Sequence, residues 1–394
     1  MSELKFNPVF AALPTTIFTH MSALAVKHNA VNLGQGFPDE DGPLSIRQVA
    51  SKALLEGPNQ YPPTRGLMPL RNAIAKHAKH FYGLEFNAET DVLITSGGTE
   101  ALTAAIMGLA GPGGEVVLIE PAYDSYGPIA EAVGAKVKSV KLTPPAWKLD
   151  ADALAAVMTP NTRVVMLNSP LNPIGRAFTR DELEGVARVI AKSNAVVVAD
   201  EVYEHLIFDG REQIPLMTLP GMRDRVVRVG SAGKMFSLTG WKIGWVTGDA
   251  KLIDPIAKAH QFLTFTTSPA LQLGIAHALE HEMDFTLNLT KTLQGNRDVL
   301  AAGLTKLGFK TLPCEGSYFL TADISGLANE PDLAFCERLV AEAGVALIPL
   351  SFFFTGGKPD HLVRFAFCKK RTLLEDALGR LEKYFHAETQ SRRG

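Results

Sequence analysis

Two lysines, Lys234 and Lys242, lie eight residues apart in the glycine- and serine-containing segment SAGKMFSLTGWKIGW (231–245). A lysine in a loop of small residues can act as a nucleophilic amine that forms a Schiff base with a carbonyl compound. Ser231 and Lys242 could then hold an anion beside that amine. The alternative is that both lysines are ordinary solvated cations.

The glycines near these lysines do not form a nucleotide-binding motif. A P-loop requires GxxxxGK[ST], but Arg228 stands at the first glycine position and Met235 follows the lysine. The stretch LGQGFPD (33–39) lacks the third glycine of a dinucleotide fingerprint and precedes no suitable βαβ unit. Both nucleotide interpretations are therefore excluded.

Two further motifs follow apolar runs and could bind a phosphate or a planar ring. In TSGGTEAL, Gly97 and Gly98 allow a ligand to approach the backbone closely, and Thr99 could cap the following helix. A helix N-terminus suits a phosphate, although a plain capped helix is the alternative. In EPAYDSYGP, Tyr123 could stack on a planar ring or simply pack in the core.

Four more polar side chains lie in apolar surroundings. Asn172, in NSPLNPIG, could offer an amide donor or serve as a turn residue, and two X-Pro steps predict an extended loop. Asp200 ends the apolar run AVVVAD, so we expect a cationic partner for it, with helix capping as the alternative. Tyr203 could direct its hydroxyl to the same place. Arg364, in HLVRFAFC, could form an internal ion pair or grip a ligand carboxylate bidentately.

The elements that must position these groups alternate along the middle of the chain. Apolar runs typical of buried strands, separated by helical patterns, occur at 91–96, 115–120, 163–169, 195–203 and 225–231. This alternation predicts an α/β fold with a mostly parallel sheet covered by helices on both faces. Such sheets bind ligands beyond the carboxyl ends of their strands, where these motifs fall.

The two ends of the chain differ from its middle. Residues 14–29 are predicted to be helical, with Pro14 near the start. The last third combines long helical patterns with short strands such as SYFLTADI, which is typical of an α+β unit. We therefore predict a large domain at 46–284 and a smaller α+β domain built from 1–45 and 285–394.

The composition limits the class of protein and its partners. Of 394 residues, 46% are hydrophobic and 20% charged, and the net charge of −2 argues against a nucleic-acid or acidic-membrane partner. Three distant cysteines predict reduced thiols in a cytoplasmic protein, without a disulfide or a zinc site. We see no signal peptide and no uninterrupted apolar stretch of about 18 residues, so we expect no membrane span. We also expect no metal site.

The motifs together fit one ligand, pyridoxal 5′-phosphate. This cofactor needs its aldehyde held by an amine, its phosphate neutralised and its pyridine nitrogen kept protonated. Asp200 would meet the last need, because a carboxylate about 4 Å from the nitrogen is worth roughly 4 kcal/mol at an effective dielectric constant near 20.

The motif set from VNLGQGFPD to VRFAFCK resembles the class I, fold type I aminotransferases that use pyridoxal phosphate, and most closely the kynurenine/glutamine/methionine aminotransferase branch. The resemblance implies a large domain with a seven-stranded-type, mostly parallel sheet, plus a smaller α+β domain. It implies a homodimer with shared active sites, in which Tyr61 reaches the phosphate of the neighbouring subunit. It also implies a ping-pong transfer of the amino group from an L-amino acid to a 2-oxo acid, with Lys234 as covalent anchor and general acid–base.

The resemblance assigns a role to each motif residue. The implied catalytic residues are Lys234, Asp200, which pairs with the pyridinium, and Tyr203. The implied phosphate ligands are Gly98, Thr99, Ser231 and Lys242. The implied ring contacts are Tyr123, by stacking, and Asn172 and Tyr203, by hydrogen bonds to the ring oxygen. The implied substrate contacts are Arg364, which grips the α-carboxylate, together with Gly36 and Asn172.

Departures from the resemblance bear on the substrate. Thr99 stands at a position where relatives selective for aspartate carry a basic residue, although Arg65 could approach from the partner. Phe265 is followed by Thr266 where the kynurenine branch has a Phe-His pair, and Phe265 with 351–357 predicts an apolar or aromatic pocket. We therefore expect methionine, glutamine or aromatic amino acids as substrates, with broad tolerance.

Other functions remain open at this point. The alternatives on the same cofactor are a cysteine-conjugate β-lyase, a decarboxylase, and an aspartate- or alanine-type aminotransferase. An effector-binding module of a transcription regulator would need an N-terminal DNA-binding domain, for which the 30 residues before Val31 leave little room.

Overall fold

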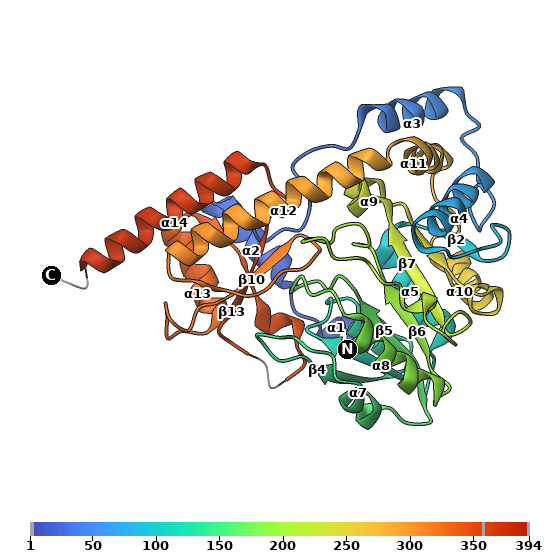
Figure 1. The fold of residues 1–394 in the computed structure, drawn as a ribbon, viewed down its shortest axis with the longest axis horizontal. Helices are drawn as coiled ribbons and strands as arrows, with labels where there is room; N and C mark the ends of the chain where they lie inside the picture. Colours follow the sequence, from blue (N-terminus) through green and yellow to red (C-terminus); the bar gives the residue numbers. More distant parts are fainter. Residues whose placement is uncertain (1–3, 357–358, 392–394) are drawn as a thin grey trace.

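A seven-stranded sheet forms the centre of the structure, a computed structural model that describes residues 4–356 and 359–391 (Figure 1). In spatial order the strands are β2 (Val92–Thr95), β8 (Gly244–Thr247), β7 (Val226–Ser231), β6 (Val196–Asp200), β5 (Thr162–Asn168), β3 (Glu115–Glu120) and β4 (Lys136–Lys141). Every neighbouring pair is parallel except the two that β8 makes with β2 and β7. The prediction of a mostly parallel sheet is confirmed.

Helices cover both faces of this sheet because the central strands are apolar on both sides. In β3, Val116 and Leu118 pack into one core with α5 and α10, whereas Val117 and Ile119 pack into the core on the other face. The first face carries α5 (Gly97–Leu109), α6 (Tyr126–Ala132) and α10 (Ala250–Leu263). The second face carries α4 (Met68–Tyr82), α7 (Ala151–Val157), α8 (Arg180–Ala191), α9 (Ala232–Met235) and α11 (Pro269–His281), and α3 (Leu44–Glu56) packs on α11.

A second, four-stranded sheet is formed by the last third of the chain. Its strands, in order, are β12 (Ile348–Pro349), β13 (Leu362–Ala366), β10 (Phe319–Asp323) and β9 (Lys310–Thr311). The helices of this region are α12 (Met283–Lys306), α13 (Asp332–Arg338) and α14 (Arg371–Ser391). Phe309, Phe335 and Phe365 are completely buried beneath them.

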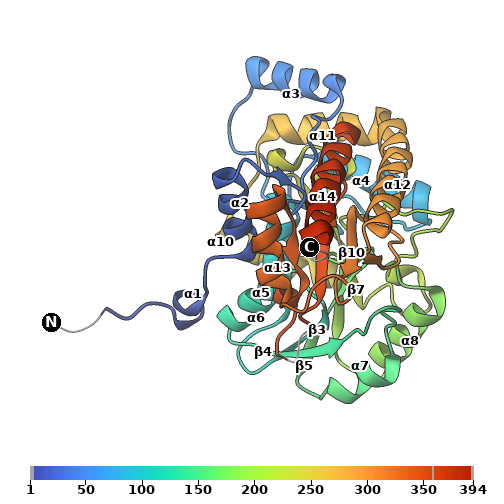
Figure 2. The same cartoon turned by 90° about the vertical axis from the view of Figure 1, so that its left-hand side faces the viewer.

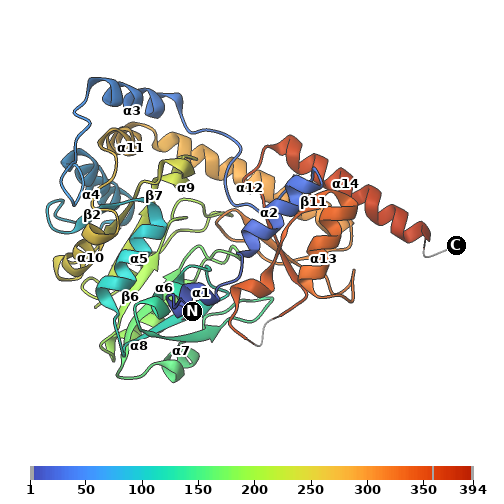
Figure 3. The ribbon, with the colours of Figure 1, turned by 180° about the vertical axis from the view of Figure 1, so that it is seen from behind.

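The two ends of the chain meet at a short parallel pairing. β1 (Val31–Asn32) pairs with β11 (Val345–Ala346), and α2 (Ile17–Lys27) lies beside them (Figure 3). α1 (Pro8–Ala12) contacts α6, and the residues before it lead away from the rest of the chain (Figure 2). This pairing agrees with a small domain drawn from both chain ends, but the boundaries at 46 and 285 stay a prediction.

The N-terminal helix differs from the prediction for residues 14–29. Pro14 lies outside α2, because the Thr16 side chain accepts the Thr19 N–H and so caps the helix two residues later. The stretch Pro8–Lys27 is 20 residues long with a mean hydropathy of 1.5, so it has the length and composition of a membrane span. That is weak evidence for a span, because α2 buries Ile17 and Met21 in the core of this chain.

Candidate active site

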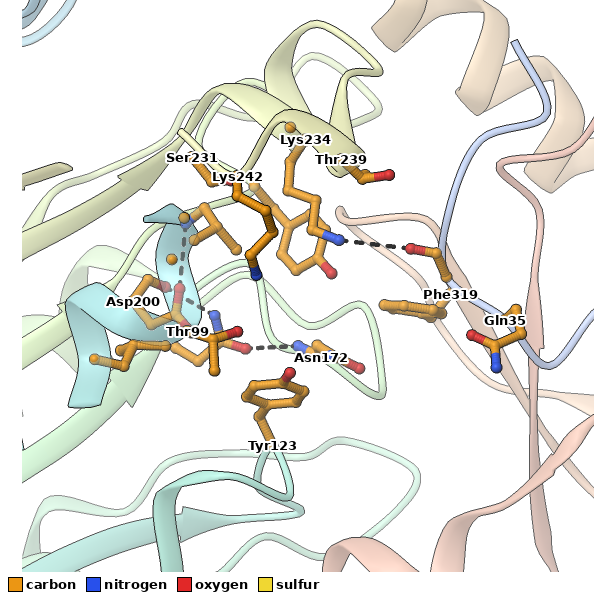
Figure 4. A pocket seen from close by; sticks show the side chains of 18 of the residues that line it. Gln35, Thr99, Tyr123, Asn172, Asp200, Ser231, Lys234, Thr239, Lys242 and Phe319 are labelled. Atoms are coloured by element: carbon orange, nitrogen blue, oxygen red, sulfur yellow. Dashed lines mark hydrogen bonds between the residues drawn. The ribbon is translucent and has the colours of Figure 1, made fainter. Parts of the chain in front are cut away.

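A cavity of about 360 Å³ opens at the carboxyl ends of β5, β6 and β7, beside the N-terminus of α5. Eleven of the twelve predicted site residues line it: Gly36, Gly98, Thr99, Tyr123, Asn172, Asp200, Tyr203, Ser231, Lys234, Lys242 and Arg364. The exception is Tyr61, which is 81% exposed and has its ring 5.3 Å from that of Phe265. Lys234 and Lys242 reach into the cavity from one side, and Tyr123 faces them from the other (Figure 4).

Lys234 projects from α9, directly after β7. Its Nζ donates a hydrogen bond to Tyr318 Oη at 2.8 Å and lies 3.5 Å from the Gly36 carbonyl oxygen, to which Tyr318 Oη donates at 2.6 Å. Burial, aided by the nearby cations Lys242 and Arg364, lowers the pKa of the amine to about 8. Roughly one amine in ten is therefore neutral and nucleophilic at pH 7.

Asp200 ends β6 and is almost completely buried. Tyr126 Oη donates to its Oδ2 at 2.5 Å, and the Val202 N–H donates to Oδ1 at 3.3 Å. No cation among residues 4–356 and 359–391 forms an ion pair with this carboxylate, so the cationic partner that we expect for Asp200 would have to come from a bound ligand. A phenol and a backbone amide satisfy the two oxygens instead. Burial raises the pKa of Asp200, and a cationic group bound in the cavity would stabilise its charge.

The N-terminus of α5 and Lys242 form a cradle for an anion. Gly97 has a φ of 78°, and a Cβ there would lie 3.2 Å from Lys242 Cε, so the glycine allows the lysine to approach the helix end. The prediction that Thr99 caps the helix is wrong. Ser96 is the residue that precedes the helix, and its N–H donates a hydrogen bond to the Glu100 carboxylate. The Thr99 side chain is thus left at the cavity, where free helix N–H groups favour a phosphate.

Asn172 is held in a turn rather than in the predicted extended loop. The Leu171 N–H donates a hydrogen bond to the Arg176 carbonyl at 2.7 Å, and the Gly175 N–H donates one to the Leu171 carbonyl at 2.7 Å. A proline restricts its own φ and the residue before it but not the residues that follow, and Gly175, with a φ of 70°, allows the chain to turn back. Asn168 Oδ1 accepts the Asn172 N–H at 2.7 Å and so fixes this turn beside β5.

Arg364 projects from β13 and is 1% exposed. Its guanidinium donates to the Gly34 carbonyl at 2.7 Å and to Asn172 Oδ1 at 3.0 Å, lies 4.0 Å from the ring centre of Phe319, and leaves Nε without a partner. Within the described part of the chain no carboxylate pairs with it, so the internal ion pair that the sequence left open is absent. Burial lowers the pKa of Arg364 to about 10. A bound carboxylate would supply the missing negative charge.

The aromatic wall of the cavity differs from the prediction. Phe18 and Phe319 line it, whereas Phe265 lies outside it in this chain. Of the predicted segment 351–357, Phe353 has its ring centre 5.2 Å from the Arg364 guanidinium carbon, and Gly357 lies outside the described residues.

Burial raises the pKa of Tyr203, so its hydroxyl remains protonated and can donate a hydrogen bond.

The sequence did not predict Tyr126 and Tyr318 as site residues, although Tyr126 contacts Asp200 and Tyr318 contacts Lys234. Tyr126 is the first residue of α6 and belongs to the same motif, EPAYDSYGP, as Tyr123, so its place shortly after β3 offered a signal for it. Tyr318 precedes β10, far from Lys234 in the sequence, and no local pattern pointed to the contact.

Comparisons with known proteins agree with this geometry. A family model described as aminotransferase class I and II matches residues 28–381. A probable N-succinyldiaminopimelate aminotransferase of Mycobacterium tuberculosis is 46% identical over 93% of this chain and 95% of its own length. A methionine aminotransferase of Escherichia coli is 40% identical over 94% of this chain and 96% of its own.

Solved structures give the same result. The structure of an N-succinyldiaminopimelate aminotransferase from M. tuberculosis has a TM-score of 0.93 at 45% identity, covering 96% of this chain and 99% of that one. An E. coli structure described as having a methionine aminotransferase function has a TM-score of 0.94 at 39% identity, covering 97% and 100%.

Proposed function

The chain belongs to the class I and II aminotransferases, and from this premise we propose that it moves the amino group of an L-amino acid with an uncharged side chain, such as methionine, glutamine or an aromatic amino acid, to a 2-oxo acid. The cofactor of the proposal is pyridoxal 5′-phosphate. The observation that carries the assignment is the convergence, in one cavity, of a buried amine, a buried carboxylate without a cationic partner, an anion cradle and a guanidinium.

The residues present fit this cofactor. Asp200 lacks a cation that a pyridinium would provide, and the cradle of α5 with Lys242 lacks an anion that a phosphate would provide. Lys234 would hold the aldehyde carbon, and Tyr123 would stack on the ring. When bound, the cofactor supplies an electron sink that weakens the Cα–H bond of the substrate.

The remaining chemistry belongs to the side chains of the chain. Lys234, with its lowered pKa, would take a proton from the substrate Cα and return it to the bound cofactor, as a general acid–base. Arg364 would orient the substrate through its α-carboxylate. Tyr203 and Asn172 would donate hydrogen bonds to the ring oxygen.

The charges that line the cavity favour an uncharged substrate side chain. Among the described lining residues the cations are Lys234, Lys242 and Arg364, and each has a role above. None is left to bind a second, distal carboxylate. Arg65, the sequence-based candidate for that task, instead donates to the Thr90 carbonyl at 3.0 Å and lies 3.4 Å from Asp254.

A second candidate substrate is N-succinyldiaminopimelate or its oxo-acid counterpart, because a relative with 46% identity carries that activity in its name. This substrate is acidic at its far end, so its use would require a cation from outside the cavity of one chain. A half-reaction screen separates the candidates: each amino acid is mixed with the purified yellow protein, and bleaching of the visible band identifies a substrate. The absence of any visible band after reconstitution would contradict the cofactor assignment.

The alternative β-lyase activity is tested separately. We expect cysteine conjugates to give pyruvate and ammonia slowly, if at all, compared with transamination. Pyruvate formation without an added 2-oxo acid, at a rate above that of amino-group transfer, would replace the aminotransferase proposal with a lyase.

We also propose a homodimer with shared sites, two domains at 46–284 and at 1–45 with 285–394, and a cytoplasmic location. Tyr61 is exposed, and Leu55 and Phe262 are each 86% exposed; these apolar side chains support a partner surface. The parallel pairing of β1 with β11 supports the domain division. All three cysteines are buried and free, which agrees with a reducing compartment.

A further inference from the structure

Two histidines and a glutamate form a cluster beside the turn that leaves the proposed cofactor site. His77 comes from α4, and Glu204 and His205 come from the turn that follows β6. A nitrogen of each imidazole and a carboxylate oxygen lie within 4.8 Å of one another. The proposed function uses none of the three side chains.

The two imidazoles face each other closely. His77 Nε2 and His205 Nε2 are 2.7 Å apart, so one of the two nitrogens must offer a lone pair to the other. In a zinc site with Zn–N bonds of about 2.0–2.1 Å, two imidazole nitrogens at a tetrahedral angle are about 3.3 Å apart. The rings therefore need to separate by only about 0.6 Å to admit a cation between them.

The burial of the cluster is graded. His77 is 6% exposed and Glu204 is 4% exposed, whereas His205 is half-buried. Phe81 packs on both imidazoles, with ring centres 4.8 Å from His77 and 4.7 Å from His205. The half-buried side of His205 leaves a path for an ion and a place for a solvent ligand.

The charges around the cluster also suit a cation. Arg228 donates to Glu204 Oε2 at 3.1 Å and to Glu201 Oε2 at 2.6 Å. The single guanidinium is shared between these two buried carboxylates, so it does not fully neutralise both. Its hydrogen bond orients the Glu204 carboxylate, as partners of metal ligands commonly do.

We propose that His77, Glu204 and His205 form a binding site for a zinc-class divalent cation, with one coordination position left to solvent. Two imidazoles, one carboxylate and an open position form a donor set that zinc accepts. The sequence predicted no metal site, because the cysteines gave no zinc pattern and His77 lies far in sequence from Glu204 and His205. A bound ion would tie α4 to the turn that follows Asp200 and carries Tyr203.

Calorimetric titration with zinc chloride tests the proposal on the full chain. The protein, with its cofactor bound, is treated with a chelator and desalted, so that no free cofactor competes for the metal. We expect one zinc per chain. His77→Gln and His205→Gln should each weaken binding by more than about 100-fold, because loss of a mere partner of a metal ligand already costs about 10–100-fold.

A matched control is the other histidine pair, His277 and His281 on α11, whose ring centres are 4.8 Å apart. His281→Gln should leave the zinc affinity unchanged if the cluster binds the ion. Circular dichroism and the melting temperature show whether each variant is folded.

X-ray absorption at the zinc edge of the wild-type protein gives a result that does not depend on any variant. We expect two imidazole ligands and oxygen ligands. Failure to bind zinc stoichiometrically, loss of binding in His281→Gln, or a spectrum without imidazole ligands would each overturn the proposal. The two histidines would then be a hydrogen-bonded pair only.

Discussion

The hydroxyl of Tyr126 donates a hydrogen bond to Asp200 Oδ2 at 2.5 Å, and both side chains are almost completely buried. Burial raises the pKa of Asp200, whereas this hydrogen bond stabilises the carboxylate and lowers it. Among the cavity-lining residues that the structure describes, Asp200 is the one carboxylate. Tyr126 therefore keeps the negative charge of the cavity in place and fixes its direction.

Tyr126→Phe should weaken cofactor binding. The change removes the hydroxyl and keeps the ring, and a hydrogen bond to a charged group is worth about 1.5–3 kcal/mol, so we expect a dissociation constant about 10- to 100-fold higher. Titration of the cofactor-free protein with pyridoxal phosphate, followed by visible absorbance, measures it. Tyr384→Phe is the matched control, because it removes a tyrosine–carboxylate hydrogen bond to Glu388 that lies on α14. Equal dissociation constants for Tyr126→Phe and wild type would contradict the role of Tyr126.

Arg364→Lys should raise the KM for the amino donor. A lysine keeps the positive charge but cannot bind a carboxylate through two parallel hydrogen bonds, and we expect KM to rise about 10- to 100-fold for that reason. The affinity for pyridoxal phosphate should change much less, since Arg364 is not itself a proposed cofactor contact and hydrogen-bonds only one of those contacts, Asn172. Steady-state kinetics with methionine and a cofactor titration on the same variant give both numbers. An unchanged KM would show that the α-carboxylate is bound by another group.

Many of the candidate residues that line the cavity share one physical property: they lie at or just after the ends of buried strands. The ends of β5, β6 and β7 carry Asn172, Asp200 and Lys234 to the same edge of the sheet, because parallel strands end side by side. Apolar runs with short polar ends are visible in one sequence, so both the sheet and these positions could be predicted.

The contacts that the sequence did not reveal depend on packing between distant segments. Tyr318 reaches Lys234 from the turn before β10, a strand of the second sheet, and Phe18 reaches the cavity from α2. The hydrogen bond from Tyr126 to Asp200 was missed for a related reason: the cost of a buried carboxylate can be offset by a hydrogen bond as well as by a cation. Local patterns do not distinguish these two solutions.

Arg228→Met should destabilise the protein strongly. Arg228 is buried and holds Glu201 and Glu204, and burial raises the pKa of Glu201 to about 7 even with the arginine present. Loss of one partner of a buried ion pair costs about 3–5 kcal/mol because the other charge stays unpaired. Urea unfolding measures the loss.

The control for this change is Arg47→Met, which breaks an exposed pair with Asp41. Such pairs contribute about 0–1 kcal/mol, so we expect a free energy of unfolding close to that of the wild type. Similar losses for Arg47→Met and Arg228→Met would contradict the importance of the buried pair.

The pKa of Lys234 predicts how the cofactor-free protein captures pyridoxal phosphate at different pH values. With a pKa of about 8, roughly one amine in ten is neutral at pH 7 and roughly nine in ten at pH 9. Only the neutral amine attacks the aldehyde, so the capture rate should rise with pH and reach half its maximum near pH 8. Stopped-flow absorbance measures the rate, and Lys234→Ala should form no covalent band at any pH. A midpoint above pH 10, where an exposed lysine titrates, would mean that burial does not activate this amine.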